Sequence, residues 1–296
     1  MFLNTKPILT VLVVLSGLVT AHCSSGNQSA REARREQIRS QAETKRLELQ
    51  QVTGEYRGDL QFTQALPARE VSLILDIQET PQDDGGSIDP VLVPQLKGAV
   101  RFPMGDTYEG ESIRFVSSAA EYDAKLEKIT LVLKNDAYHD LALTLTNSDH
   151  NLDGTWSSSE YGLSGGLSLM KPTPALAKPL TKPVKGTYRG TITRLSDATF
   201  IAPRGTVTIN LSQDSSDPRG VSFSGSLRLY LGNFDSIEYR EYPFTTFNYN
   251  VYSGEFSAKA SGEQEFNLKG VVRDGTLNTA LENGLGTIGK FEGAQP

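Results

Sequence analysis

The strongest constraint on the fold is that the sequence repeats itself. Three pairs of similar segments occur in the same order in two halves of the chain: VTGEYRGDLQF (52–62) with VKGTYRGTITRL (184–195), KGAVRFPMGD (97–106) with SGSLRLYLGN (224–233), and LDGTW (152–156) with RDGTL (273–277). One match of this length is weak evidence, but three in one order indicate a duplicated structural unit. We therefore expect two domains of the same fold, at residues 52–170 and 184–296.

Each copy carries apolar residues at every second position. VSLILDI (71–77) and LALTLT (141–146) in the first copy, and TVTINL (206–211) in the second, are typical of half-buried β-strands. Gly, Asn, Asp and Pro residues separate such segments, and neither copy has sustained helical periodicity. The prediction is an all-β protein with two tandem duplicated antiparallel domains, each closed into a small barrel or packed as a sandwich.

Two connecting segments complete the predicted organisation. KPTPALAKPLTKP (171–183) contains four prolines, which predict a semi-stiff extended linker between the domains. Residues 23–51 precede the first domain, and from residue 29 onward they are helix formers without Gly or Pro. Apolar residues are sparse there, which predicts a polar helical stalk exposed to solvent, with a partner-binding coiled coil as the alternative.

Residues 1–22 have the composition of a signal peptide. Lys6 precedes an apolar run from Ile8 to Val19, which is short for a membrane span of about 20 residues. Cleavage after Ala21 would release a secreted protein. Alternatively Cys23, the only cysteine of the chain, would be acylated.

The segment that ends at Cys23 resembles the signal of bacterial lipoproteins, in which Leu and two small residues precede the lipidated cysteine. A short polar tether, residues 24–27, follows Cys23 as in that class, whereas His22 and Thr20 depart from its usual residues. The resemblance implies a lipid anchor at Cys23. It places the protein in the bacterial cell envelope, at the outer membrane or the periplasmic face, with a secreted or periplasmic protein as the alternative.

Composition narrows the expected partners. The formal net charge is −6, and residues 31–48 are basic, so the remainder of the mature chain is more acidic than the total indicates. An acidic body disfavours nucleic acid. A single cysteine excludes an intramolecular disulfide, so hydrophobic burial must stabilise the fold. The partners we expect are the membrane, through the lipid, and a protein in the envelope.

Catalytic motifs are missing from the sequence. It contains no Gly-x-Ser-x-Gly elbow, His-Glu-x-x-His pair, P-loop or dinucleotide fingerprint. His139 and Asp140 are neighbours, but adjacent residues of a strand face opposite ways. We predict a binding or scaffolding protein and no enzyme; a lipocalin-like carrier of a small apolar ligand and an envelope hydrolase are the alternatives.

The repeated Gly-x-Tyr-x-Gly unit also bears on the fold. In a strand Gly54, Tyr56 and Gly58 share one face, and Arg57 points to the other. The unit resembles the Gly-x-Trp start of lipocalin-like barrels, over five residues and with Tyr in place of Trp. That resemblance implies a small β-barrel and carries over no functional residue.

Residues 149–160 have the spacing of a calcium loop, D-x-[DN]-x-[DN]-G-x5-E. The pattern assigns oxygen ligands to these residues: Asp149, Asn151, Asp153, Thr155 through its carbonyl, and Glu160. The preceding LALTLTNS alternates like a strand, however, and Asp153-Gly154 is a signal for a hairpin turn with Trp156 packed inward. No cofactor is expected apart from calcium in the first domain.

YREYPFTTFNYNVYSGEF (239–256) contains seven Phe or Tyr residues. It either forms a stacking surface for a sugar or peptide, or is a half-buried strand with Phe247 and Tyr249 facing inward. The alternation favours the strand. It leaves Tyr239, Tyr242 and Tyr252 as candidate surface contacts.

Overall fold

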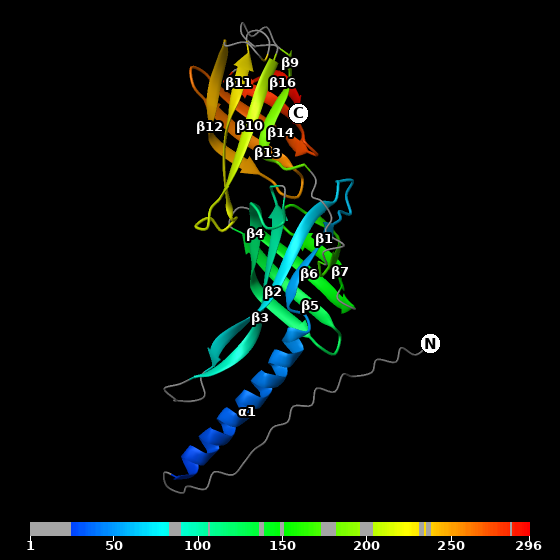
Figure 1. Ribbon diagram of the computed structural model, residues 1–296, viewed down its shortest axis with the longest axis vertical. Coiled ribbons are helices and arrows are strands. Elements are labelled where there is room, and N and C mark those ends of the chain that lie inside the picture. The colour runs from blue at the N-terminus through cyan, green and yellow to red at the C-terminus, as the bar shows by residue number, and fades with distance from the viewer. Residues whose placement is uncertain are drawn as a thin grey trace, which may run out of the picture.

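The computed structural model describes residues 25–82, 90–105, 107–135, 139–148, 151–172, 182–195, 204–230, 234, 238–284 and 286–296, and within these the chain forms one helix and sixteen strands (Figure 1). The helix and the strands of the first barrel are α1 (Ser25–Gln50), β1 (Gly54–Leu60), β2 (Arg69–Gln82), β3 (Val91–Pro103), β4 (Ser112–Asp123), β5 (Lys128–Asn135), β6 (His139–Ser148), β7 (Asn151–Ser158) and β8 (Leu163–Met170). The strands of the second barrel are β9 (Gly186–Arg194), β10 (Arg204–Gln213), β11 (Val221–Tyr230), β12 (Tyr239–Tyr249), β13 (Glu255–Ser261), β14 (Glu265–Arg273), β15 (Thr276–Asn283) and β16 (Gly286–Ala294).

Each set of eight strands is an antiparallel meander that closes on itself. In the first barrel β1 pairs with both β2 and β8, and in the second β9 pairs with both β10 and β16. This confirms the prediction of two tandem β-domains after an N-terminal helix, and it selects barrels over sandwiches.

The period-two pattern places apolar side chains inside the barrels. Along β5, Ile129, Leu131 and Leu133 are fully buried and alternate with more exposed residues. The bulkiest buried side chains include Trp156 in the first barrel and Tyr188 in the second. An eight-stranded barrel is just wide enough for side chains to fill its interior, so the interior of each barrel is a packed core.

The repeated Gly-x-Tyr-x-Gly unit has the same structure in both barrels. The buried hydroxyl of Tyr56 donates to the carbonyl of Val52 at 2.9 Å, and that of Tyr188 donates to Val184 at 2.6 Å. A Cβ atom on Gly58 would lie 2.0 Å from a carbonyl oxygen of β8. Glycine is therefore required where β1 passes close to β8 to close the barrel.

The third pair of repeat segments is not structurally equivalent. Asp274-Gly275 is the turn between β14 and β15, with φ values of 46° and 76°, as an Asp-Gly hairpin requires. Asp153-Gly154 instead lies within β7, where Gly154 approaches the backbone of Thr144. The prediction of a turn at Asp153-Gly154 is therefore wrong, because the alternation of the flanking residues, which decides strand position, outweighs one dipeptide.

The helix packs on an arm of the first barrel. β2 and β3 continue past the barrel as a long hairpin, and α1 lies against this hairpin (Figure 1). Ile38, Ala42 and Leu49 share one helix face and are buried, and Arg46 bonds to Glu79 of β2 at 2.8 Å. The helix agrees with the prediction, but its C-terminal part is not the fully solvent-exposed stalk that was expected. The few apolar residues there have helical spacing, so they share one face and are buried together.

The barrels are joined end to end (Figure 1). The turn after β12 inserts Tyr252, which is 0% exposed, into the end of the first barrel. Its ring stacks on Trp156, with centroids 5.4 Å apart, and meets the edge of Phe102 at 5.3 Å. One hydrophobic cluster runs through both barrels. Most of the predicted proline linker, residues 173–181, lies outside the described residues.

Candidate binding surfaces at the barrel junction

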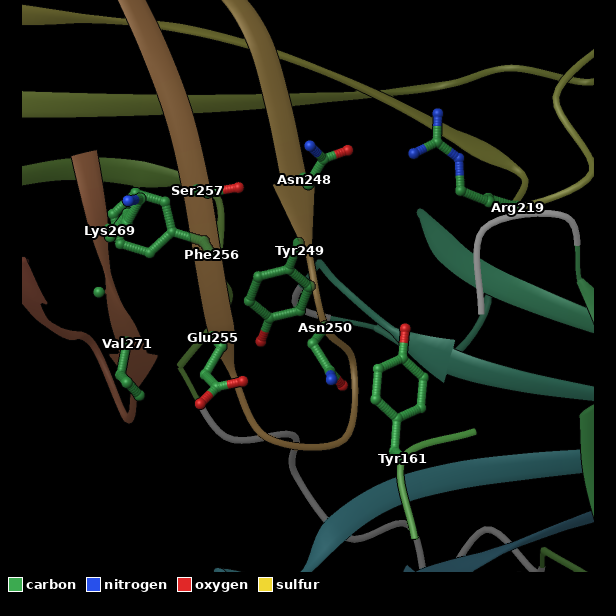
Figure 2. Close-up of a pocket in the computed structure, with 11 residues that line it drawn as sticks. Tyr161, Arg219, Asn248, Tyr249, Asn250, Glu255, Phe256, Ser257, Lys269 and Val271 are labelled. Carbon is green, nitrogen blue, oxygen red and sulfur yellow. The ribbon is translucent and has the colours of Figure 1, made fainter. Parts of the chain in front are cut away.

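A groove of about 680 Å³ lies beside the junction, on the outer face of the second barrel (Figure 2). Its floor includes a row across three strands, in which Asn248 of β12 pairs with Ser257 of β13, and Ser257 pairs with Lys269 of β14. Tyr161, from the turn after β7, and Arg219, from the loop before β11, lie on the opposite side of the groove from Lys269 (Figure 2). The groove therefore takes residues from both barrels.

Arg219 and Lys269, which line the groove, are each paired with a carboxylate, and the Glu255 carboxylate accepts a hydrogen bond from Ser253 at 3.1 Å. Arg219 donates to both carboxylate oxygens of Asp217, from Nη2 at 2.7 Å and from Nε at 3.0 Å, and this hydrogen bonding lowers the pKa of Asp217. Lys269 lies 2.9 Å from Glu282. A ligand would therefore meet neutral hydrogen-bonding groups and the Glu255 carboxylate beside Tyr161, the pKa of whose hydroxyl is raised by burial and by Glu160.

This arrangement suits a polar, uncharged ligand or an extended peptide, which amides, a hydroxyl and an aromatic edge can bind. The described residues that line the groove include no histidine or cysteine, and no hydrogen bond joins Ser257 to a base. A nucleophile–base pair is therefore not assembled there.

The predicted calcium ligands do not surround a common point. Asn151, Asp153 and Thr155 take alternate outward positions along β7, Glu160 follows in the next turn, and Asp149 lies outside the described residues. Strand residues two apart are separated by about 7 Å, whereas calcium binds oxygen at about 2.3–2.6 Å. Among the described residues no three His, Cys, Asp or Glu side chains form a metal-binding group. The calcium site stays a prediction.

The side chains around this segment have structural partners. Asp153 accepts a hydrogen bond from Ser168 of β8 at 2.6 Å. Trp156 faces inward, as the hairpin interpretation expected, and its indole donates to the carbonyl of Gln61 at 2.7 Å. The outward row of β7 is therefore part of the barrel wall.

Two of the three candidate surface tyrosines are buried, so that prediction is wrong for them. Tyr242 is 1% exposed and packs edge-on against Phe266 at 4.8 Å, and Tyr252 occupies the junction. A β-bulge between Phe244 and Thr246 changes which residues of β12 face inward, and so turns Tyr242 into the core. Tyr239 remains at the surface, 42% exposed.

The N-terminal prediction concerns a segment outside the described residues. Cys23 and the signal peptide lie there, so lipid attachment stays a prediction. In the described part of the chain, no helix is both long and apolar enough to cross a membrane. The side chain of His139 also lies outside the described residues.

Sequence reasoning missed the groove and a second feature, two rows of polar residues on the outer faces of the barrels. The row of the first barrel joins Arg57, Ser72, Arg101 and Arg114 across β1–β4, and that of the second joins Arg189, Thr206, Arg228 and Glu241 across β9–β12. The sequence did contain a signal of these rows, because in each of the first two pairs of repeat segments an arginine is the only charged residue that both copies share.

Searches with this chain against protein-family models, curated proteins and solved structures found no match.

Proposed function

We propose that the protein is a non-catalytic binding or scaffolding lipoprotein, anchored through Cys23 in the bacterial cell envelope. Helix α1 would hold the two barrels away from the membrane. Its 26 residues correspond to about 39 Å at 1.5 Å per residue. The predicted polar tether of residues 24–27 is mostly part of the helix, since α1 begins at Ser25, so a lipid on Cys23 would be attached close to the start of a rigid helix.

One observation carries the proposal: the first barrel is filled and both of its ends are occupied. Leu49 and Val52, at and just after the end of α1, belong to its core cluster, and Tyr252 enters from the second barrel. A ligand would then bind on the outer surface, where the groove of Figure 2 lies. The lipocalin-like alternative needs an open interior, and no specific observation favours a hydrolase.

The anchor is tested by feeding cells radiolabelled palmitate and comparing the native chain with Cys23→Ser, with Ser24→Ala as the matched control. We expect label and membrane sedimentation for the native chain and for Ser24→Ala, and neither for Cys23→Ser. An unlabelled native chain would reject the anchor. Mass spectrometry of an organic extract tests the carrier alternative, and one apolar molecule per chain would replace our proposal with it.

A further inference from the structure

The two polar rows differ at one decisive position. Both rows contain an arginine, a hydroxyl residue and a second arginine on adjacent strands. In the first barrel these three residues face outward, because their chain neighbours Tyr56, Leu73 and Val100 face into the core and successive strand residues point to opposite faces. The fourth position is Glu241 in the second barrel and Arg114 in the first.

In the second barrel Glu241 neutralises the row. Its carboxylate lies 3.1 Å from Nη2 of Arg228 and accepts a hydrogen bond from Ser226 at 2.8 Å. The pKa of Glu241 is lowered by these two interactions, the bond from Ser226 first. This row therefore contains its own anion.

In the first barrel the same place holds a second cation. Arg57 is paired with Glu55 at 2.8 Å, whereas Nε of Arg101 and Nε of Arg114 are buried without a hydrogen-bond partner among the described residues, as is Nε of Arg228 in the second row. The pKa of Arg101 is lowered by burial and by the charge of Arg114. Like charges directly opposite each other destabilise a sheet. The charge of Glu55, which is paired with Arg57, acts on Arg101 in the opposite direction, but no ion pair with a carboxylate is formed by Arg101 or Arg114 within the described part of the chain.

A third group of the first row is also unsatisfied. Ser72 lies between Arg57 and Arg101 in the register and is 1% exposed, and no described residue forms a hydrogen bond with its hydroxyl. A buried polar group without a partner destabilises the folded state. Arg114 lies against Gly220 of the second barrel, where a Cβ atom would lie 2.7 Å from its Nε. The backbone of the loop before β11 therefore packs directly against the Nε side of this guanidinium, and a side chain at residue 220 would collide with it.

We propose that Arg101, Arg114 and Ser72 form a binding site for a phosphate group. A phosphate monoester carries close to two negative charges at neutral pH, which would balance the two guanidinium groups. Each arginine offers a fork of N–H donors that matches phosphate oxygens, and the Ser72 hydroxyl supplies one more donor. The phosphate would occupy the role that the Glu241 carboxylate has in the second barrel.

This inference rests on the proposed function, to which it adds a class of ligand. The phosphate can belong to a soluble molecule or to a lipid headgroup, since the three side chains would bind the same group in both. Titration of the full-length chain with inorganic phosphate, in an uncharged detergent and a buffer of low ionic strength at pH 7.5, measures the site directly by calorimetry.

We expect one phosphate per chain, and a dissociation constant at least about tenfold higher in Arg114→Glu, because the variant replaces a charge-assisted hydrogen-bond donor by a carboxylate that repels phosphate. This variant supplies the carboxylate that the second row already has, so it should melt at or above the native temperature without phosphate. Arg189→Gln, in the second row, should bind phosphate as the native chain does. Binding should weaken at pH 5, where phosphate carries a single negative charge.

Two results would overturn the site: no saturable phosphate binding by the native chain, or equal binding by Arg114→Glu. Sedimentation of Cys23→Ser with vesicles of phosphatidic acid or of phosphatidylcholine identifies the source. Binding to phosphatidic acid that Arg114→Glu abolishes assigns a lipid headgroup, and binding of soluble phosphate alone assigns a soluble ligand. Palmitate labelling of Arg114→Glu scores the anchor separately, so failure of the site leaves the proposed function standing.

Discussion

Replacing Tyr252 by alanine should uncouple the two barrels. The ring is fully buried between them and contacts Trp156, Phe102 and Phe115 of the first barrel. Truncation of a buried aromatic residue to alanine costs about 3–5 kcal/mol. For a barrel of this size that loss lowers the melting temperature by about 10 °C or more.

Two optical probes separate the barrels in this experiment. Trp156 is the only tryptophan and reports on the first barrel, whereas far-UV circular dichroism reports on both. In the native chain the continuous core should make the two urea transitions coincide. In Tyr252→Ala the normalised Trp156 transition should separate from the dichroism transition.

Tyr242→Ala is the matched control, because that tyrosine is equally buried but packs within the second barrel, against Phe266. It should lower stability by a similar amount and keep the two transitions together. Coincident transitions at the native midpoint in Tyr252→Ala would refute the idea that this side chain couples the barrels.

Three further predictions concern the first barrel. Gly58→Ala should lower the free energy of urea unfolding by about 3 kcal/mol or more, because the new Cβ would lie 2.0 Å from a carbonyl oxygen. Gly284→Ala is the control: a Cβ there would have no atom of the described residues within 4 Å, so stability should change by less than about 0.5 kcal/mol. Burial raises the pKa of Tyr56 to about 12 from 10.0. The contribution of the neutral hydroxyl to stability is therefore complete below pH 10 and is lost as the pH rises from 10 to 12. Tyr56→Phe should reduce this loss of stability at alkaline pH, as followed by circular dichroism. Millimolar calcium should leave the melting temperature unchanged, since β7 spreads its oxygen ligands along a strand; a rise that Asp153→Ala with Glu160→Ala abolishes would instead establish the calcium site.

Local patterns predicted the elements better than the surfaces. Alternation identified strands such as β6 and β10, and helix-forming composition identified α1, because these signals depend on near neighbours in sequence. The exposure of Tyr242 could not be predicted, since the bulge in β12 is a property of its pairing with β13. The groove was not predicted because it joins Tyr161 to a strand of the other barrel.

Repeats, alternation and composition were enough to predict two β-domains of the same fold, a tyrosine between glycines at the start of each, and a helix before them. Closure of the strands into barrels, the entry of Tyr252 into the first barrel and the pairing of Arg101 with Arg114 are seen in the folded protein alone. Side-chain alternation follows from the geometry of a single strand. Closure, docking and cross-strand pairing instead join residues far apart in the chain, and their register depends on the whole packed core.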